Sequence, residues 1–445
     1  MNLRKFLTML IIFVMGSTTI LPNLSATNIN SNSITTLETP KSYLIKNVPY
    51  VNQETNFYCD FASSTMLFKY QGINTNLNEV LYLTGTGFSL AYQDRFIQPG
   101  YFISKNYTFV THLYNLSYNR WSLNITGKSE EYCWNEYWTR VKQNISNNVP
   151  LKTFANMNLL ESFRSVSDIP DFILDILPCS GHEIVIVGYN ENNNTVCFND
   201  PYIGAINDPE KGYYVWMDLT EYKNAVWTEA KFHQKFNDVH MSIETFTKIS
   251  DPPSKEIIYK KAYLRNIEKL KGNISSYDAD FVVGNISKKF GSLVGLKALE
   301  KLNEDFKSDL YDRILTVIKL KKRNKRVPIL MKISNILGLL DDGNISSEDL
   351  FGNPYFTVLK EKNYLTEFLN ENNDSLQISN EELSLYQQEI KNWTAFYQDY
   401  KIFMNKGLRL SILRGLFLIN EMSKKLENII EIEQDIIDLA TEGEI

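Results

Sequence analysis

Histidine and cysteine are both scarce in this chain, whose 445 residues include four of each. They form none of the closely spaced sets, such as HExxH or paired CxxC, that bind zinc, so the sequence predicts no metal and no other cofactor. An excess of basic residues is also missing. The formal charge is −6 and the isoelectric point is about 5.5, which argues against a nucleic-acid partner because proteins that bind phosphate backbones are usually basic.

Long apolar runs are absent outside the N-terminus, so no second segment is expected to span a bilayer. At the N-terminus, Arg4 and Lys5 precede an apolar run at 6–16, and small residues follow at 24–26. Residues 1–26 therefore have the pattern of a signal peptide, which predicts a secreted or cell-surface protein. If this segment stays uncleaved, it is the one expected contact with a membrane. The polar segment 27–44 is expected to be a flexible stem.

The stretch 48–72, VPYVNQETNFYCDFASSTMLFKYQG, contains the first candidate for a reactive group. Apolar residues recur at helical spacing after Cys59, which predicts a helix that begins at the cysteine and stops at Gly72. The partial positive charge at a helix start favours the thiolate, which is the nucleophilic form of cysteine. Gln53, on the incoming loop, is placed to stabilise an oxyanion. A buried structural cysteine is the alternative for Cys59.

The stretch 179–202, CSGHEIVIVGYNENNNTVCFNDPY, reads as a hairpin of two strands. Pairing of Tyr189 with Thr195 is expected across the turn. It would bring Asp200 to a position diagonal to His182, on the same face of the sheet. A thiol nucleophile needs a histidine to take its proton and an acceptor to orient the ring. The predicted catalytic set is therefore Cys59, His182, Asp200 and Gln53.

These two stretches resemble the two halves of the papain-like peptidases that process bacteriocin precursors. They resemble more closely the family of the butirosin-biosynthesis acyltransferase, to which GTGFSLAY at 85–92 and FGSLVGLKALEKLNEDF at 290–306 are also similar. The resemblance implies a papain-like α+β fold and an acyl-enzyme formed by Cys59. One position departs from it: Asp60 follows the cysteine where the bacteriocin-processing enzymes usually have glycine. A carboxylate there is expected to raise the thiol pKa and to oppose the helix dipole.

A break at Asp251, Pro252 and Pro253 separates this region from a helical one, since two prolines cannot lie inside a helix. We expect a papain-like α+β domain at 45–250 and an all-α domain at 251–445. The second domain has no histidine or cysteine, so it is not expected to hold a metal or the nucleophile. Helical periodicity is found at 256–271, 291–306, 309–322, 329–340, 381–404 and 408–439.

Three further cysteines are Cys133, Cys179 and Cys197. At most one disulfide can form among them, and Cys179 with Cys197 is the pair that the hairpin brings near. The alternative is that all three are buried thiols that form no disulfide. Cys179 is also a rival nucleophile because it lies three residues before His182, although no helix start lies beneath it.

The leading hypothesis is an exported cysteine hydrolase, a peptidase or amidase, that acts on a peptide, amide or acyl substrate. An amine in place of water would make the same acyl-enzyme an acyltransferase, as the closer resemblance implies. The third reading is a non-catalytic surface-binding protein that keeps the fold, and Asp60 is the one feature that favours it.

Overall fold

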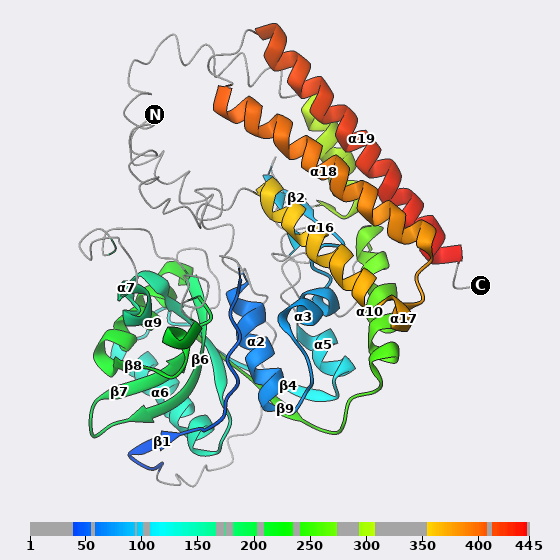
Figure 1. Ribbon diagram of the computed structural model, residues 1–445. Helices are drawn as coiled ribbons and strands as arrows, with labels where there is room; N and C mark the ends of the chain where they lie inside the picture. The colour runs from blue at the N-terminus through cyan, green and yellow to red at the C-terminus, as the bar shows by residue number, and fades with distance from the viewer. Residues whose placement is uncertain are drawn as a thin grey trace. The chain divides into compact units, whose positions relative to one another are not determined.

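The chain forms two compact units in the computed structural model (Figure 1). The first consists of Met1–Val80, Lys105–Pro253 and Asp280–Asn285, and the second of Leu81–Ser104, Ser254–Ala279 and Ile286–Ile445. The segment Leu81–Ser104 belongs to the second unit although it falls within the predicted first domain, 45–250. The residues that the structure describes are 39–54, 58–93, 96–100, 107–165, 174, 181–202, 209–234, 241–273, 293–307, 354–406 and 412–442, so the predicted signal peptide lies outside them.

A seven-stranded antiparallel sheet organises the first unit (Figure 1). The strand order is β4-β9-β5-β6-β7-β8, and β1 also pairs with β6. The eight inner residues of β6, rich in Ile and Val, are all buried, as expected for a strand covered on both faces. The strands are β1 (Ser42–Leu44), β4 (Leu116–Leu123), β5 (Leu151–Asn156), β6 (Gly181–Asn190), β7 (Thr195–Asn199), β8 (Val215–Asp218) and β9 (Met241–Lys248).

Helices cover both faces of this sheet, and two neighbouring residues of β5 show which helix lies on which face. Lys152 contacts Asp60 of α2. The next residue, Thr153, hydrogen bonds with Tyr137 of α6, which in turn bonds with Tyr222 of α9. Since successive residues of a strand point to opposite faces, α2 lies on one face and α6 and α9 on the other. The helices of the first unit are α2 (Cys59–Tyr70), α5 (Tyr107–Leu113), α6 (Glu130–Ser146), α7 (Glu161–Arg164) and α9 (Leu219–Gln234), and α3 (Leu77–Thr84) begins in the first unit and ends in the second.

The hairpin of β6 and β7 differs from the prediction at its turn and agrees with it at its far end. Thr195 pairs with Asn190, so the predicted pairing with Tyr189 is wrong. A β-bulge in β6 beside Gly188 then shifts the register by one residue. The last pair of the ladder, Val185 with Asn199, has the predicted register, and Asp200 is the next residue of the chain.

Strand β1 lies within the segment that was predicted to be a flexible stem, 27–44. Its passage beside β6 depends on Gly188, where a Cβ would lie 2.6 Å from Leu44 Cδ1 and 2.9 Å from the carbonyl oxygen of Tyr43. A strand of three residues is too short for an alternating pattern to reveal it in the sequence.

The second unit is mainly helical, with a small sheet in the order β10-β2-β3. An α+β domain followed by a helical region is therefore confirmed. The predicted helices at 309–322 and 329–340 lie outside the described residues, and α16 was not predicted. None of the helices that the structure describes is long and apolar enough to cross a bilayer. The elements are β2 (Ala91–Gln93), β3 (Phe96–Gln98), α10 (Lys255–Leu270), β10 (Leu293–Val294), a helix at 296–307, α16 (Pro354–Glu371), α17 (Asn373–Leu376), α18 (Asn380–Lys406) and α19 (Ile412–Glu442).

The core of the second unit joins residues that are far apart in the sequence. Leu90 and Tyr92, from the segment Leu81–Ser104, are buried in one cluster with Trp393 of α18 and Met422 of α19. This packing explains why the segment folds with the second unit.

A buried lysine holds the three long helices of the second unit together. Lys362 of α16 is 3% exposed, and its Nζ lies 2.5 Å from Glu389 of α18 and 3.0 Å from Glu433 of α19. Burial lowers the pKa of Lys362, but the two carboxylates outweigh this and raise it above its usual value. Burial raises the pKa of Glu433 to about 8, although Lys362 opposes the shift. Lys362 therefore keeps its positive charge between the two acidic side chains.

We predict that Lys362→Met lowers the free energy of unfolding by about 3–5 kcal/mol, because it leaves a buried carboxylate without its cation. The matched control is Lys424→Met, whose exposed ammonium lies 2.9 Å from Glu421 and should contribute under about 1 kcal/mol. Urea unfolding of the full chain measures both losses. Equal losses in the two variants would contradict this account.

Candidate active site

Cys59 is the first residue of α2, as predicted. Its thiol is half-buried and is not part of a disulfide. The helix begins directly after Tyr58, whose side chain does not cap it. The sulfur therefore lies at the positive end of the helix dipole, where an anion is stabilised.

The structure brings Cys59, His182 and Asp200 together. His182, the second residue of β6, is 2% exposed, and its Nε2 lies 2.7 Å from Oδ1 of Asp200. The imidazole also hydrogen bonds with the thiol of Cys59. Because Nε2 faces Asp200, the bond to the thiol falls to Nδ1. This is the order nucleophile, base and orienting carboxylate that thiol chemistry requires.

The electrostatics of this group favour a protonated imidazole. Burial alone would lower the pKa of His182, but the carboxylate of Asp200 and the hydrogen bonds to Asp200 and Cys59 raise it to about 10. For Asp200, burial would raise the pKa, but the charge of His182 and three hydrogen bonds lower it below its usual value. An imidazolium beside the thiol favours the thiolate.

Asp200 is held in place by hydrogen bonds on all sides. Its Oδ2 accepts from Ser162 Oγ at 2.6 Å, and its Oδ1 accepts from the backbone N–H of Tyr202 at 2.9 Å. The backbone N–H of Asp200 donates to the carbonyl of Gly212 at 2.8 Å, and its carbonyl accepts from the hydroxyl of Tyr50 at 2.8 Å. The carboxylate can rotate only by breaking several of these bonds, so it fixes the orientation of the histidine ring.

Gln53, the fourth predicted residue, is fully buried, and its backbone N–H donates to the carbonyl of Pro201 at 3.1 Å. Pro201 follows Asp200, so the loop that carries Gln53 lies against the turn that carries the carboxylate. Its role as an oxyanion donor stays a prediction.

Asp60 lies in a different environment from the one expected. Its carboxylate is 2% exposed and forms an ion pair with the ammonium of Lys152 in β5. The expected rise in the pKa of the Cys59 thiol stays a prediction, but the carboxylate that would cause it is paired with a buried cation. Opposite charges in contact cancel much of each other's field at a neighbouring group.

The other described cysteines are poorly placed for chemistry. Cys133 and Cys197 are buried thiols, and burial raises the pKa of both, that of Cys197 to about 12. Buried thiols of this kind are inert. Cys179, the rival nucleophile and the candidate partner of Cys197, lies outside the described residues.

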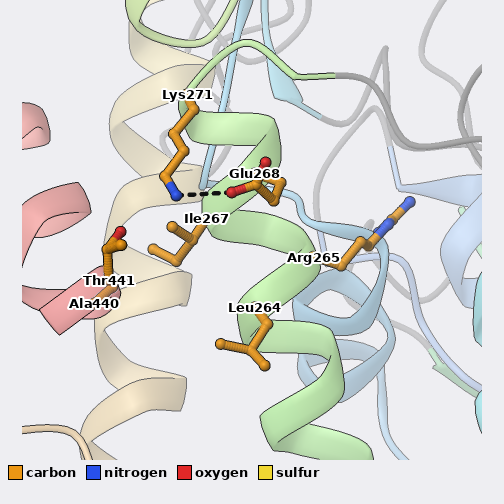
Figure 2. Close-up of a pocket in the computed structure, with 7 residues that line it drawn as sticks. All are labelled: Leu264, Arg265, Ile267, Glu268, Lys271, Ala440 and Thr441. Carbon is orange, nitrogen blue, oxygen red and sulfur yellow. Dashed lines mark hydrogen bonds and ion pairs between the residues drawn. The ribbon is translucent and has the colours of Figure 1, made fainter. Parts of the chain in front are cut away.

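A pocket of about 320 Å³ in the second unit lies between α10 and the end of α19 (Figure 2). Leu264 and Ile267 line it from α10, and an ion pair of 2.7 Å joins Glu268 and Lys271 at its wall. Arg265 points away, and its guanidinium donates to backbone carbonyls in the segment Leu81–Ser104. The pocket wall has no nucleophile paired with a base, so it is not a candidate active site. In the part of the chain that the structure describes, no cluster of three or more metal-ligating side chains occurs.

Residues 45–235 match the Peptidase_C39 like family. The matched range contains Cys59, His182 and Asp200, and it relates this part of the chain to papain-like cysteine peptidases. The Peptidase_C39-like region therefore supports a cysteine-peptidase type of enzyme with a peptide or amide substrate. No match is found among curated proteins.

Sequence reasoning missed two groups that hold Asp200 in the candidate site. The bond from the Tyr202 backbone to Asp200 is an Asx turn, which the order Asp-Pro-Tyr could have indicated. Ser162 had no such signal, because a single serine on a short helix shows nothing of its partner 38 residues away.

We predict that Ser162→Ala weakens the site more than it weakens the fold. The loss of a hydrogen bond to a buried carboxylate costs about 1–3 kcal/mol, and a looser Asp200 should slow alkylation of Cys59 at pH 6 by about tenfold. Ser165→Ala, on the exposed side of the same turn, is the control. Iodoacetamide labelling resolved by mass measures both, and equal rates in the two variants would mean that Ser162 does not orient the site.

A second prediction follows from the pKa of His182, which is raised from 6.5 to about 10 on folding. The folded state binds this proton more tightly than the unfolded state does. The protonated His182 therefore contributes its full stabilisation of the fold below pH 6.5, and this contribution is lost as the pH rises toward 10. Urea unfolding should show this fall in Cys59→Ala, where no thiol titrates and Asp200 still raises the pKa of His182, although the fall should end at a lower pH because the contribution of Cys59 is lost. Adding Asp200→Asn should flatten it, and an unchanged slope in the double variant would contradict the assignment.

Proposed function

We propose that the first unit is a cysteine hydrolase that cleaves a peptide or amide bond through an acyl-enzyme on Cys59, and that the protein is exported. The observation that carries the proposal is the pairing of His182 with a fully anchored Asp200 beside a thiol at a helix start. The match of residues 45–235 to the Peptidase_C39 like family supports the same reaction type. Export is supported by the signal-like pattern of residues 1–26.

In the proposed reaction, the Cys59 thiolate attacks the carbonyl carbon and a carbon–sulfur bond forms. The side-chain amide of Gln53 and the backbone N–H of Cys59 stabilise the oxyanion. The carbon–nitrogen bond then breaks, and His182 gives its proton to the leaving amine. Water, deprotonated by His182, attacks the thioester and releases the acid and the thiolate.

An amine in place of water would give an amide product, which is the acyl transfer that the resemblance to the butirosin-biosynthesis family implies. The other reading is a non-catalytic binding protein, and the feature that favours it is Asp60, whose carboxylate is paired with Lys152.

The proposal predicts that Cys59→Ala reduces turnover of an acyl thioester by more than about a hundredfold, since the nucleophile has no substitute. Cys133→Ala is the matched control, because this thiol is buried and its pKa is raised by burial. Product masses should be measured with and without an added amine. Free acid in both samples supports hydrolysis, and an amide product would assign acyl transfer. Turnover by Cys59→Ala equal to that of the wild type would refute the proposed nucleophile.

A further inference from the structure

Lys152 of β5 is an ammonium buried among carboxylates. The residue is 2% exposed, and its Nζ lies 2.8 Å from Oε2 of Glu244 and 3.2 Å from Oε2 of Glu183. It also pairs with the carboxylate of Asp60 and donates to Ser64 Oγ at 3.1 Å. A buried cation with this many partners is fixed in position, because any displacement breaks several charge-assisted bonds.

The partners of Lys152 include the chain neighbours of both reactive residues. Asp60 follows Cys59 at the start of α2, and Glu183 follows His182 at the start of β6. One ammonium therefore joins the residue after the nucleophile to the residue after the base. A second bond supports the same link, since Ser63 Oγ of α2 donates to the backbone carbonyl of Glu183 at 3.1 Å.

The charges explain why the lysine is needed at this point. Besides Asp60 and Glu183, the cluster contains Glu244 of β9, which also lies 3.6 Å from Nε of Arg120 on β4. Burial alone would lower the pKa of Lys152, but the three carboxylates outweigh it and raise the pKa well above its usual value. The ammonium also lies 4.4 Å from the ring centroid of Tyr107 on α5, which adds a cation–π contact. Without Lys152, the three buried carboxylates would lose the cation that they share.

We propose that Lys152 is a positioning residue, which sets the spacing of Cys59 and His182 by holding the carboxylates of Asp60 and Glu183 on one ammonium. This inference rests on the proposed function. A thiolate and an imidazolium stabilise each other only at hydrogen-bond distance, because their attraction weakens as they separate. With the ammonium removed, no cation joins residue 60 of α2 to Glu183 of β6, and the start of α2 moves away from β6.

The test compares two variants that change the charge of the cluster differently. Lys152→Met removes the bridge and the cation. Lys152→Met combined with Asp60→Asn removes the bridge, but it takes away one positive and one negative charge, so the net charge of the cluster is retained. Removing the Asp60 carboxylate by itself favours the Cys59 thiolate. In the double variant the lost cation disfavours the thiolate and the lost carboxylate favours it, so the two charge effects oppose each other and slower alkylation reports the loss of spacing.

The measurement is the rate of alkylation of Cys59 by iodoacetamide from pH 5 to pH 10, in the full chain without substrate and with the adduct located by mass. Among the residues that the structure describes, His182, Asp200 through that ring and Asp60 carry or exchange charge near the thiol. Both variants should lose reactivity at pH 6 by about tenfold or more, which corresponds to about one unit in the thiol pKa. Lys152→Arg, which keeps the charge and can bridge carboxylates, should restore part of the rate.

Lys362→Met is the matched control for stability, because it removes a buried lysine between two carboxylates in the second unit. It should unfold more easily than the wild type and keep the alkylation profile of Cys59. If Lys152→Met does not fold, the double variant decides the question. A double variant that is alkylated as fast as the wild type would overturn the positioning role alone. A wild-type thiol that titrates near the free-cysteine value of about 8.5 would overturn the proposed function and this inference with it.

Discussion

Backbone hydrogen bonding along β6 is the constraint on which the first unit depends. This strand pairs with β5, β7 and β1, so its backbone has partners on both edges. It carries His182 at one end and Gly188 at the other, and its inner side chains are buried under helices on both faces. The strand cannot shift without breaking the hydrogen bonds of three ladders. Residues that contact it are therefore fixed in position with it. The histidine, its carboxylate and the helix that presents the thiol are all placed by this one element.

The sequence was sufficient for the parts of the site that follow local rules. Helical periodicity after Cys59 and the Ile-Val run after His182 predicted α2 and β6, and both predictions are confirmed. The relation of Asp200 to His182 could be predicted because side chains alternate along strands. The pairing at the turn was nevertheless wrong by one residue, and a bulge that no pattern announced corrected it. That part of the prediction succeeded only because the two deviations cancel.

What could not be predicted is the set of contacts between distant segments. The contact of Lys152 with Asp60 crosses 92 residues, and that of Ser162 with Asp200 crosses 38. From the sequence alone, a lysine in an apolar strand would be placed at an exposed edge. Its burial can be explained only once its partners are known. Asp60 is the clearest example, because beside Cys59 in the sequence it looks like an obstacle to thiolate chemistry. In the structure its carboxylate forms an ion pair with Lys152, which lies on β5 of the sheet that α2 covers.

The assignment of Leu81–Ser104 to the second unit bears on the order in which the protein is made. Leu90 and Tyr92 leave the ribosome long before Trp393 and Met422, with which they share a core. At about 5–20 residues per second, the wait lasts about 20 seconds to a minute. For that time the apolar segment lacks the part of its core that α18 and α19 supply, although α10 is available earlier to cover Phe88. The first unit can close its sheet around this loop, but the second can complete its core only when synthesis is nearly finished. The late arrival of α18 and α19 therefore makes completion of this core the last folding step of the chain.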